Sequence, residues 1–156
     1  MCLVFIRHKK LFTEMRLKFN QRILSAFYID FSTGNCMKKR ILVVDDDSMN
    51  LARTRIILGK DYDVLLADSG IEALVKLRNE KVDMVLLDID MPEMNGIETF
   101  ERMKKAAVAV PVIFLTASGL EEDVQNAIKL GAVNYLKKPY RPEELIKRVA
   151  QEFEKA

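Results

Sequence analysis

The apolar residues after Met37 gather into five short runs, separated by longer segments that mix apolar and polar positions. Three of the runs, at residues 41–44, 84–87 and 112–115, are apolar throughout. Runs without alternation are typical of strands buried on both faces, as in a parallel sheet. We therefore predict strands at residues 41–44, 62–66, 84–88, 112–115 and 133–136.

The segments between the runs carry helix signals. Ser69 and Ser118 each stand three residues before a glutamate, the order of a capping box, and Pro142 precedes two acids as helix N-termini favour. Helices are predicted at residues 48–58 with Gly59 as a stop, after Ser69, at 96–107, at 118–131 and from Pro142. Apolar spacing of three and four predicts inward faces at Ile71, Leu74 and Val75, at Ile97, Phe100 and Met103, and at Leu145, Ile146, Val149 and Phe153.

Five strands alternating with five helices indicate an α/β fold, a doubly wound parallel sheet with helices on both faces. We assign residues 37–156 to this one domain. The chain holds 156 residues, 49% of them apolar, which is enough for one core of ordinary size.

Residues 1–36 form a basic N-terminal extension. Its apolar positions Phe12, Met15, Phe19, Ile23 and Phe27 have helical spacing, so one interpretation is an amphipathic helix that touches a membrane surface or a partner. The interpretation we favour is a dispensable tail or a start upstream of the natural one at Met37. The apolar run at residues 3–6 is too short to span a bilayer, so we expect a cytoplasmic protein without a membrane span.

Charge and composition exclude several classes of function. Six of the 25 Lys and Arg and two of the 23 acids lie in residues 1–36, which leaves 19 basic and 21 acidic residues in the domain. The domain is therefore slightly acidic, and the net charge of the whole chain, +2, is too small to suggest nucleic-acid binding. Cys2, His8 and Cys36 lie in the extension, so the domain can form neither a Cys/His zinc site nor a Ser-His-Asp or Cys-His hydrolase.

Polar residues close four of the predicted strands: Asp45 and Asp46, Asp88, Thr116 and Lys138. Because the carboxyl ends of parallel strands share one edge of the sheet, we expect these side chains to converge. Clustered carboxylates repel one another unless a cation neutralises them, and oxygen ligands without Cys or His suit Mg²⁺.

A lysine and a hydroxyl beside such a cluster supply what a phosphoryl group requires. Lys138 offers a positive charge to one oxygen, Thr116 a hydrogen bond to another, and the metal would hold a third. Asp88 is then placed as the nucleophile that attacks phosphorus to give an acyl phosphate.

The motifs Val43-Val44-Asp45-Asp46, Asp88 with Met91-Pro92 and Gly96, Thr116-Ala117, and Lys138-Pro139 resemble those of response-regulator receiver domains, the family of the chemotaxis protein CheY. The resemblance covers residues 38–155. It implies a (βα)5 fold with strand order 2-1-3-4-5, as in flavodoxin and CheY.

The resemblance also implies a role for each motif residue. Asp88 would accept a phosphoryl group from a sensor histidine kinase or a histidine phosphotransfer protein. Asp45, Asp46, Asp88 and the backbone carbonyl of Asp90 would arrange the Mg²⁺, and Lys138 would pair with the phosphoryl group.

Further positions are implied to form the switch. Thr116 would bind the phosphoryl oxygens and move, Tyr135 would turn inward with it, and a cis peptide bond would precede Pro139. Asp90 and Ser118 would flank the route of the attacking water. The output is expected on the face made by the fourth helix, fifth strand and fifth helix, where a protein target would bind.

Two alternatives concern the kind of protein. Haloacid-dehalogenase-type phosphatases also use Asp-x-Asp, Thr or Ser, Lys and an acidic pair around Mg²⁺, but their Asp-x-Asp comes first in the chain. Here Asp45-Asp46 precede Asp88-x-Asp90, which favours a phosphorylated switch over an enzyme that turns substrate over. Since the chain stops after the last predicted helix, we expect a single-domain regulator, either a stand-alone signal or a phosphorelay intermediate, without direct nucleic-acid binding.

Overall fold

Five parallel strands form the centre of the computed structural model, which describes residues 27–30, 35–117, 125 and 128–155. The strands are β3 (Arg40–Val44), β4 (Asp63–Ala67), β5 (Met84–Asp88), β6 (Val112–Thr116) and β7 (Asn134–Lys137). They pair in the order β4-β3-β5-β6-β7. Counted from β3 as the first strand, this is the order 2-1-3-4-5, so the predicted fold is confirmed.

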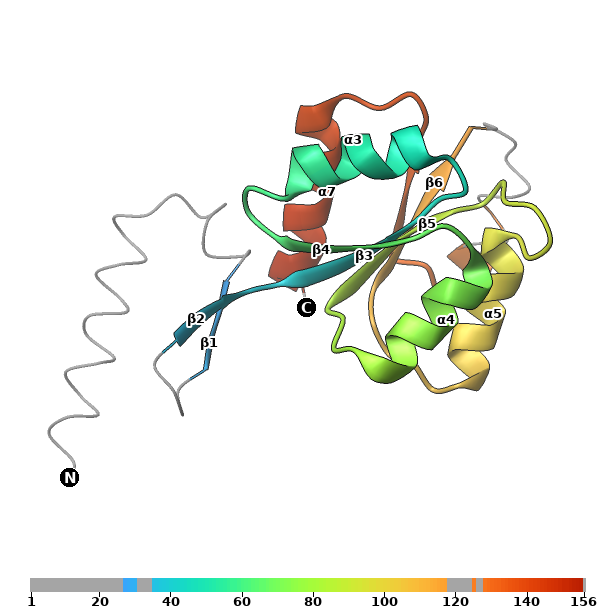
Figure 1. Ribbon diagram of the computed structural model, residues 1–156, viewed down its shortest axis with the longest axis horizontal. Coiled ribbons are helices and arrows are strands. Elements are labelled where there is room, and N and C mark those ends of the chain that lie inside the picture. Colours follow the sequence, from blue (N-terminus) through green and yellow to red (C-terminus); the bar gives the residue numbers. More distant parts are fainter. Residues whose placement is uncertain (1–26, 31–34, 118–124, 126–127, 156) are drawn as a thin grey trace, which may run out of the picture.

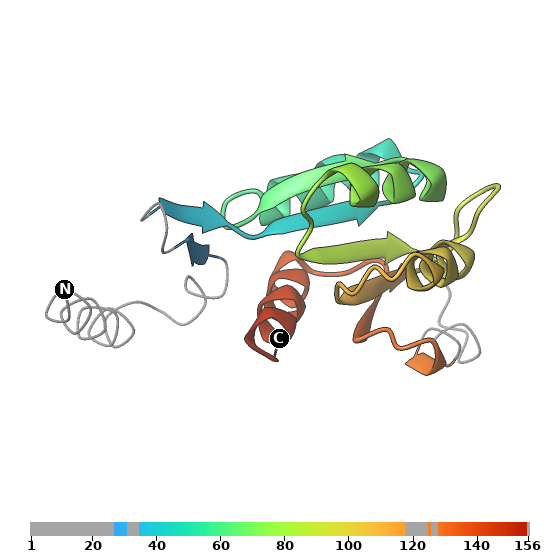
Figure 2. The ribbon, with the colours of Figure 1, turned by 90° about the horizontal axis from the view of Figure 1, so that it is seen from below.

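Helices cover both faces of this sheet. The helices in the described part of the chain with full bounds are α3 (Ser48–Leu58), α4 (Gly70–Asn79), α5 (Gly96–Lys105) and α7 (Pro142–Lys155). In Figure 1 the sheet is seen nearly edge-on, with α3 and α7 on one face and α4 and α5 on the other. Figure 2 turns the molecule by 90°, so that the broad sides of the strands are seen.

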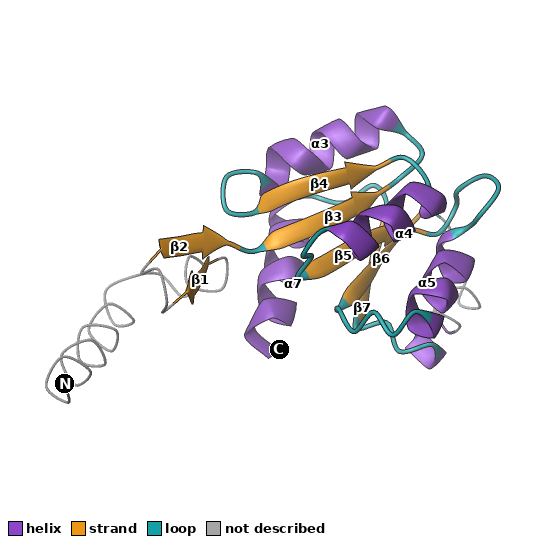
Figure 3. Cartoon of the chain, turned by 60° about the horizontal axis from the view of Figure 1, so that its bottom comes forward, coloured by secondary structure: helices purple, strands orange, loops and turns teal. Residues whose placement is uncertain are grey.

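The central strands are apolar throughout residues 41–44, 84–87 and 112–115, because each of these side chains meets one of the two helix layers. Along β3, Ile41 and Val43 belong to the core beneath α3 and α7. Leu42 and Val44 point the other way, into the core beneath α4 and α5. Figure 3 shows helices on both sides of the sheet, which is what the unbroken apolar runs predict.

Polar side chains begin three of the helices. Asp47, Ser69 and Asn95 each have extended backbone angles and accept a hydrogen bond from an amide two or three residues later, at 2.8–3.3 Å. They satisfy amides that a helix leaves without partners in its first turn. The carboxylate of Glu72 accepts from the amide of Asp68, so the predicted capping box at Ser69 is present with a shifted return bond.

The predicted inward face of α4 is wrong at two of its three positions. Ile71 and Val75 are 54% and 53% exposed, whereas Gly70 and Ala73 are buried. Gly70 lies against Thr99 of α5, where a Cβ would overlap the threonine hydroxyl. Close packing of α4 on α5 through small residues rotates the helix, and apolar spacing alone does not report such packing. The inward faces predicted for α5 and α7 are confirmed by the burial of Phe100 and Leu145 and their neighbours.

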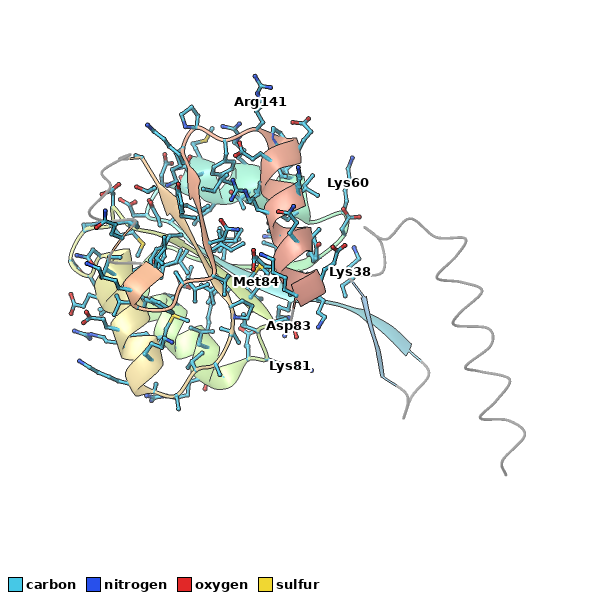
Figure 4. All side chains as sticks on the ribbon, turned by 180° about the vertical axis from the view of Figure 1, so that it is seen from behind. Lys38, Lys60, Lys81, Asp83, Met84 and Arg141 are labelled. Atoms are coloured by element: carbon cyan, nitrogen blue, oxygen red, sulfur yellow. The ribbon has the colours of Figure 1, made fainter. Side chains whose placement is uncertain are left out.

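Two short strands precede the domain and were not predicted. β1 (Phe27–Asp30) and β2 (Asn35–Lys38) pair antiparallel, across the expected boundary at residues 36 and 37. The Lys38 ammonium donates to the carbonyl of Lys60 at 2.7 Å, just past α3, and Figure 4 labels both residues. The amphipathic helix was predicted from Phe12 to Phe27. Residues 12–26 lie outside the described residues, and at Phe27 the prediction is wrong, because this residue begins strand β1.

In the described part of the chain, no helix is long and apolar enough to cross a membrane.

Ala107, just after α5, offers a test of local backbone strain. Its φ is 56°, in the left-handed region that only glycine adopts at no cost. We expect Ala107→Gly to raise the free energy of unfolding by about 1 kcal/mol. Urea denaturation measures this, with Ala106→Gly, whose φ is −84°, as the control that loses stability. A loss in both variants would contradict the expectation.

Candidate functional site

Side chains that end the strands meet at the carboxyl edge of the sheet. Asp45 directly follows β3, Asp88 ends β5, Thr116 ends β6 and Lys138 directly follows β7. Because these strands are parallel neighbours, their last residues share one edge. The fold therefore brings residues from four distant parts of the sequence to the place where they were expected to converge.

Three carboxylates form an acidic cluster at this edge. Oxygen atoms of Asp45, Asp46 and Asp88 all lie within 4.8 Å of one another. Asp45 and Asp88 are 1% and 3% exposed, while Asp46 is exposed to solvent. The cluster thus has two buried members and one open side, and its oxygen-only donors suit a hard cation.

The ammonium of Lys138 lies between the two buried carboxylates. Its Nζ is 2.6 Å from Asp45 Oδ2 and 2.8 Å from Asp88 Oδ2, and the lysine side chain is 15% exposed. The other oxygen of Asp88, Oδ1, is buried and makes no hydrogen bond within the described residues. A buried carboxylate oxygen without a donor is uncommon and requires an explanation.

The protonation equilibria of Asp88 and Lys138 follow from this arrangement. Burial raises the pKa of the Asp88 carboxyl above its ordinary value, and the hydrogen bond and charge of Lys138 only partly offset that effect. Burial would lower the pKa of the Lys138 ammonium, but its hydrogen bonds to Asp45 and Asp88 outweigh the burial and raise the pKa. The lysine is therefore charged at neutral pH.

Asp45 is held more firmly than the sequence suggested. Its Oδ1 accepts hydrogen bonds from the Asp47 amide at 3.0 Å and from Asn50 Nδ2 at 3.2 Å, while its Oδ2 faces Lys138. Sequence reasoning missed Asn50. Its place in the first turn of a helix that begins just after Asp45 is the signal that points to such a contact.

Backbone pairing sets the position of Lys138. The Lys138 amide donates to the carbonyl of Thr116 at 2.7 Å, which continues the pairing of β7 with β6. The peptide bond between Lys138 and Pro139 is cis, the isomer that the resemblance implies. Thr116 itself is buried, at 1% exposure.

The remaining predicted positions surround this centre. Tyr135 lies in β7 and is 42% exposed. Asp90 is exposed in the loop after β5. Ser118 lies outside the described residues.

Gly96 holds the loop after Asp88 against the end of β5. Its amide donates to the carbonyl of Ile89 at 3.0 Å. A Cβ at this position would overlap the backbone carbonyl oxygen of Asp88 and would lie 2.9 Å from the Ile89 Cα. Only glycine permits this approach of α5 to the strand end.

The sequence and the fold both match known proteins. The family model of the response regulator receiver domain matches residues 41–150. The DNA-binding response regulator MtrA of Mycobacterium tuberculosis is 40% identical over 114 residues, 72% of this chain and 50% of the relative. The alkaline phosphatase synthesis transcriptional regulatory protein PhoP of Bacillus subtilis is 38% identical, over 72% of this chain and 48% of its own length.

Solved structures agree with the sequence match. A CheY-like receiver domain protein from Methanospirillum hungatei superimposes with a TM-score of 0.71 at 33% identity, over 75% of this chain and 94% of that one. Chemotaxis protein CheY4 of Vibrio cholerae gives a TM-score of 0.68 at 31% identity, over 72% and 97% of the two chains.

The expectation that the protein does not bind nucleic acid is wrong, because relatives that match this chain contradict it. Among the matching relatives, MtrA is named as a DNA-binding regulator, and the chain spans about half the length of the curated relatives it matches. The slight acidity of this domain does not argue against DNA binding, because a receiver domain can belong to a regulator whose DNA contacts lie elsewhere.

The raised pKa of Asp88 predicts how stability changes with pH. The neutral carboxyl favours the folded state, so its contribution is complete below the ordinary pKa and is lost as pH rises through the folded-state pKa. Asn mimics the neutral form. In EDTA we expect Asp88→Asn to be more stable than wild type at pH 7. The difference should shrink as the pH falls through the raised folded-state pKa of Asp88 and be smallest at about pH 4 and below.

Urea unfolding at both pH values, followed by circular dichroism, measures that difference. Asp68→Asn makes the same chemical change at an exposed position after β4 and serves as the control. A stability difference for Asp88→Asn that is the same at both pH values would contradict the expectation.

Crowding at Gly96 predicts a second effect. We expect Gly96→Ala to lower the free energy of unfolding by about 1–3 kcal/mol, because the added methyl group overlaps the Asp88 carbonyl. Glu101→Ala, at an exposed position of the same helix, is the control in the same urea titration. Equal midpoints for both variants and wild type would remove the steric argument.

Proposed function

The chain belongs to the response regulator receiver domain family of two-component systems, and from this membership we propose that it is a phosphorylation switch. Asp88 accepts a phosphoryl group from a phosphohistidine on a sensor kinase or a histidine phosphotransfer protein. Phosphorylation then changes the surface that the domain presents to its target.

One observation carries this proposal. Asp88 is buried at the end of β5, with Oδ2 beside the Lys138 ammonium and Oδ1 without a hydrogen bond within the described residues. An oxygen without a hydrogen bond in the described part of the chain is open to form a bond to phosphorus. The neighbouring lysine provides a positive charge for the oxygens of the incoming group.

The acidic cluster fits a magnesium ion. Asp45, Asp46 and Asp88 would hold it, together with the backbone carbonyl of Asp90, and the exposed side of Asp46 leaves room for waters. When bound, the metal supplies charge neutralisation for the phosphoryl oxygens and the carboxylates.

The transfer itself requires no acid or base from this chain. A carboxylate oxygen of Asp88 forms a bond to phosphorus as the bond from phosphorus to the imidazole nitrogen breaks, and the electron pair returns to that nitrogen. The product is an acyl phosphate on Asp88. Lys138 keeps its proton, and its ammonium pairs with one phosphoryl oxygen. The Thr116 hydroxyl donates a hydrogen bond to a second phosphoryl oxygen.

The domain is then a switch rather than a turnover enzyme. Attack of water on the phosphorus returns Asp88 to a carboxylate and releases inorganic phosphate, so the only substrate is the domain's own aspartate. The order of Asp45-Asp46 before Asp88 and the family match favour this over the haloacid-dehalogenase-type phosphatase.

Two kinds of output are compatible with this switch. Movement of Thr116 and Tyr135 would alter the face that includes β7 and α7, where a protein target binds. The regulators MtrA and PhoP among the relatives carry DNA-binding and transcriptional names. We therefore include a DNA-binding unit, in this protein or a partner, among the outputs that phosphorylation would control.

Phosphotransfer from purified histidine kinases tests the function. We expect one kinase of the organism to label the protein rapidly in the presence of Mg²⁺. Asp88→Ala and EDTA are each expected to abolish labelling, because they remove the nucleophile and the metal. Radiolabel retained on the protein after electrophoresis is the measurement.

Asp83→Ala is the matched control, because Asp83 directly precedes Met84, the first residue of β5, whereas Asp88 is the last residue of that strand. Figure 4 labels Asp83 and Met84. It is expected to keep its label. Labelling that survives in Asp88→Ala, or many turnovers of p-nitrophenyl phosphate per chain, would refute the switch.

A further inference from the structure

Tyr140, two residues beyond Lys138, is bound to α3 at two points. Its hydroxyl lies 2.8 Å from the hydroxyl of Thr54, and both side chains are buried, at 6% and 0% exposure. Its backbone carbonyl accepts a hydrogen bond from Arg53 at 3.1 Å, and the guanidinium lies 5.8 Å from the centre of the tyrosine ring. We refer to these contacts of Arg53 and Thr54 with Tyr140 as the α3 clamp.

The same helix holds the opposite side of the site. Asn50 lies three and four residues before Arg53 and Thr54, so the three side chains share one side of α3. Asn50 donates to Asp45 Oδ1, and Asp45 Oδ2 accepts from Lys138. The contacts form a closed path from α3 through Asp45 and Lys138 to Tyr140 and back to α3.

The path is short on the side of the lysine. Only Pro139 separates Lys138 from Tyr140, and the proline ring fixes φ of Pro139, one of the four soft backbone angles between the Cα atoms of Lys138 and Tyr140. A displacement of Tyr140 therefore acts on the Lys138 backbone through only a few bonds. The Lys138 ammonium has to stay within hydrogen-bond distance of both Asp45 and Asp88, which leaves a narrow range of acceptable positions.

We propose that Arg53, Thr54 and Tyr140 are positioning residues, which hold the Lys138 ammonium over Asp45 and Asp88 and so set the rate at which Asp88 accepts a phosphoryl group. This inference rests on the proposed function. The competing explanation is that Tyr140 is only a core residue whose buried hydroxyl needs a partner.

A clamp variant with Arg53→Ala, Thr54→Val and Tyr140→Phe separates the two explanations. It removes both buried hydroxyls together, so neither is left without a partner, and the urea midpoint is expected to stay close to wild type. Phosphorylation of Asp88 by acetyl phosphate in the presence of Mg²⁺ is expected to become roughly tenfold slower. This is the loss typical of substitutions at residues that orient the groups of a site without contacting the substrate.

A second readout reports on Lys138 directly. The ¹H–¹⁵N NMR signal of its ammonium, assigned by its loss in Lys138→Met, is expected to shift or broaden in the clamp variant. Thr54→Ser keeps the hydroxyl and is expected to retain the wild-type rate and the wild-type Lys138 signal. If the clamp variant does not fold, the single variant Thr54→Val takes its place, and Thr54→Ser is compared with it in the same way. Tyr62→Phe removes the hydroxyl of another buried tyrosine at the opposite edge of the sheet and is the matched control.

A wild-type rate, or an unchanged Lys138 signal in a slowed variant, would overturn the positioning role. If wild-type protein is not phosphorylated at all, the proposed function fails by that measurement. The Lys138 signal then still decides whether the α3 clamp holds the lysine.

Discussion

The contact on which the rest of the site depends is that of one ammonium with two buried carboxylates. Asp45 and Asp88 lie at the ends of adjacent strands, and both are almost fully withdrawn from solvent. Two such charges destabilise a fold strongly unless a cation compensates them. Lys138 does so at 2.6 and 2.8 Å, and its own charge is maintained by the same contacts.

The charge of Lys138 does not fully compensate the negative charge of the site. Asp88 Oδ1 stays without a hydrogen bond within the described residues, and burial keeps the pKa of its carboxyl raised. A third carboxylate, Asp46, adds negative charge on the open side. The site is therefore short of positive charge in the position where a divalent cation and a phosphoryl group would enter, which fits the phosphorylation switch that we propose.

The supporting structure comes from the backbone and from one helix. Parallel pairing places the strand ends together, and the hydrogen bond from the Lys138 amide to Thr116 extends that pairing to the lysine. On the other side, α3 contacts Asp45 through Asn50 and Tyr140 through Thr54. The helix α3 thus contacts both sides of the site, although Thr54 lies almost ninety positions before Tyr140 in the sequence.

The sequence alone determined the fold class and which polar residues stand at the carboxyl ends of the strands. Unbroken apolar runs specify buried parallel strands, and Asp45, Asp88, Thr116 and Lys138 stand at their ends, where chain order and strand direction bring them together. Only the tertiary structure decided the inward face of α4, because close packing at Gly70 overrides apolar spacing, and the roles of Asn50, Thr54 and Tyr140. These contacts join residues with no local pattern, so they exist only once the helix lies on the sheet.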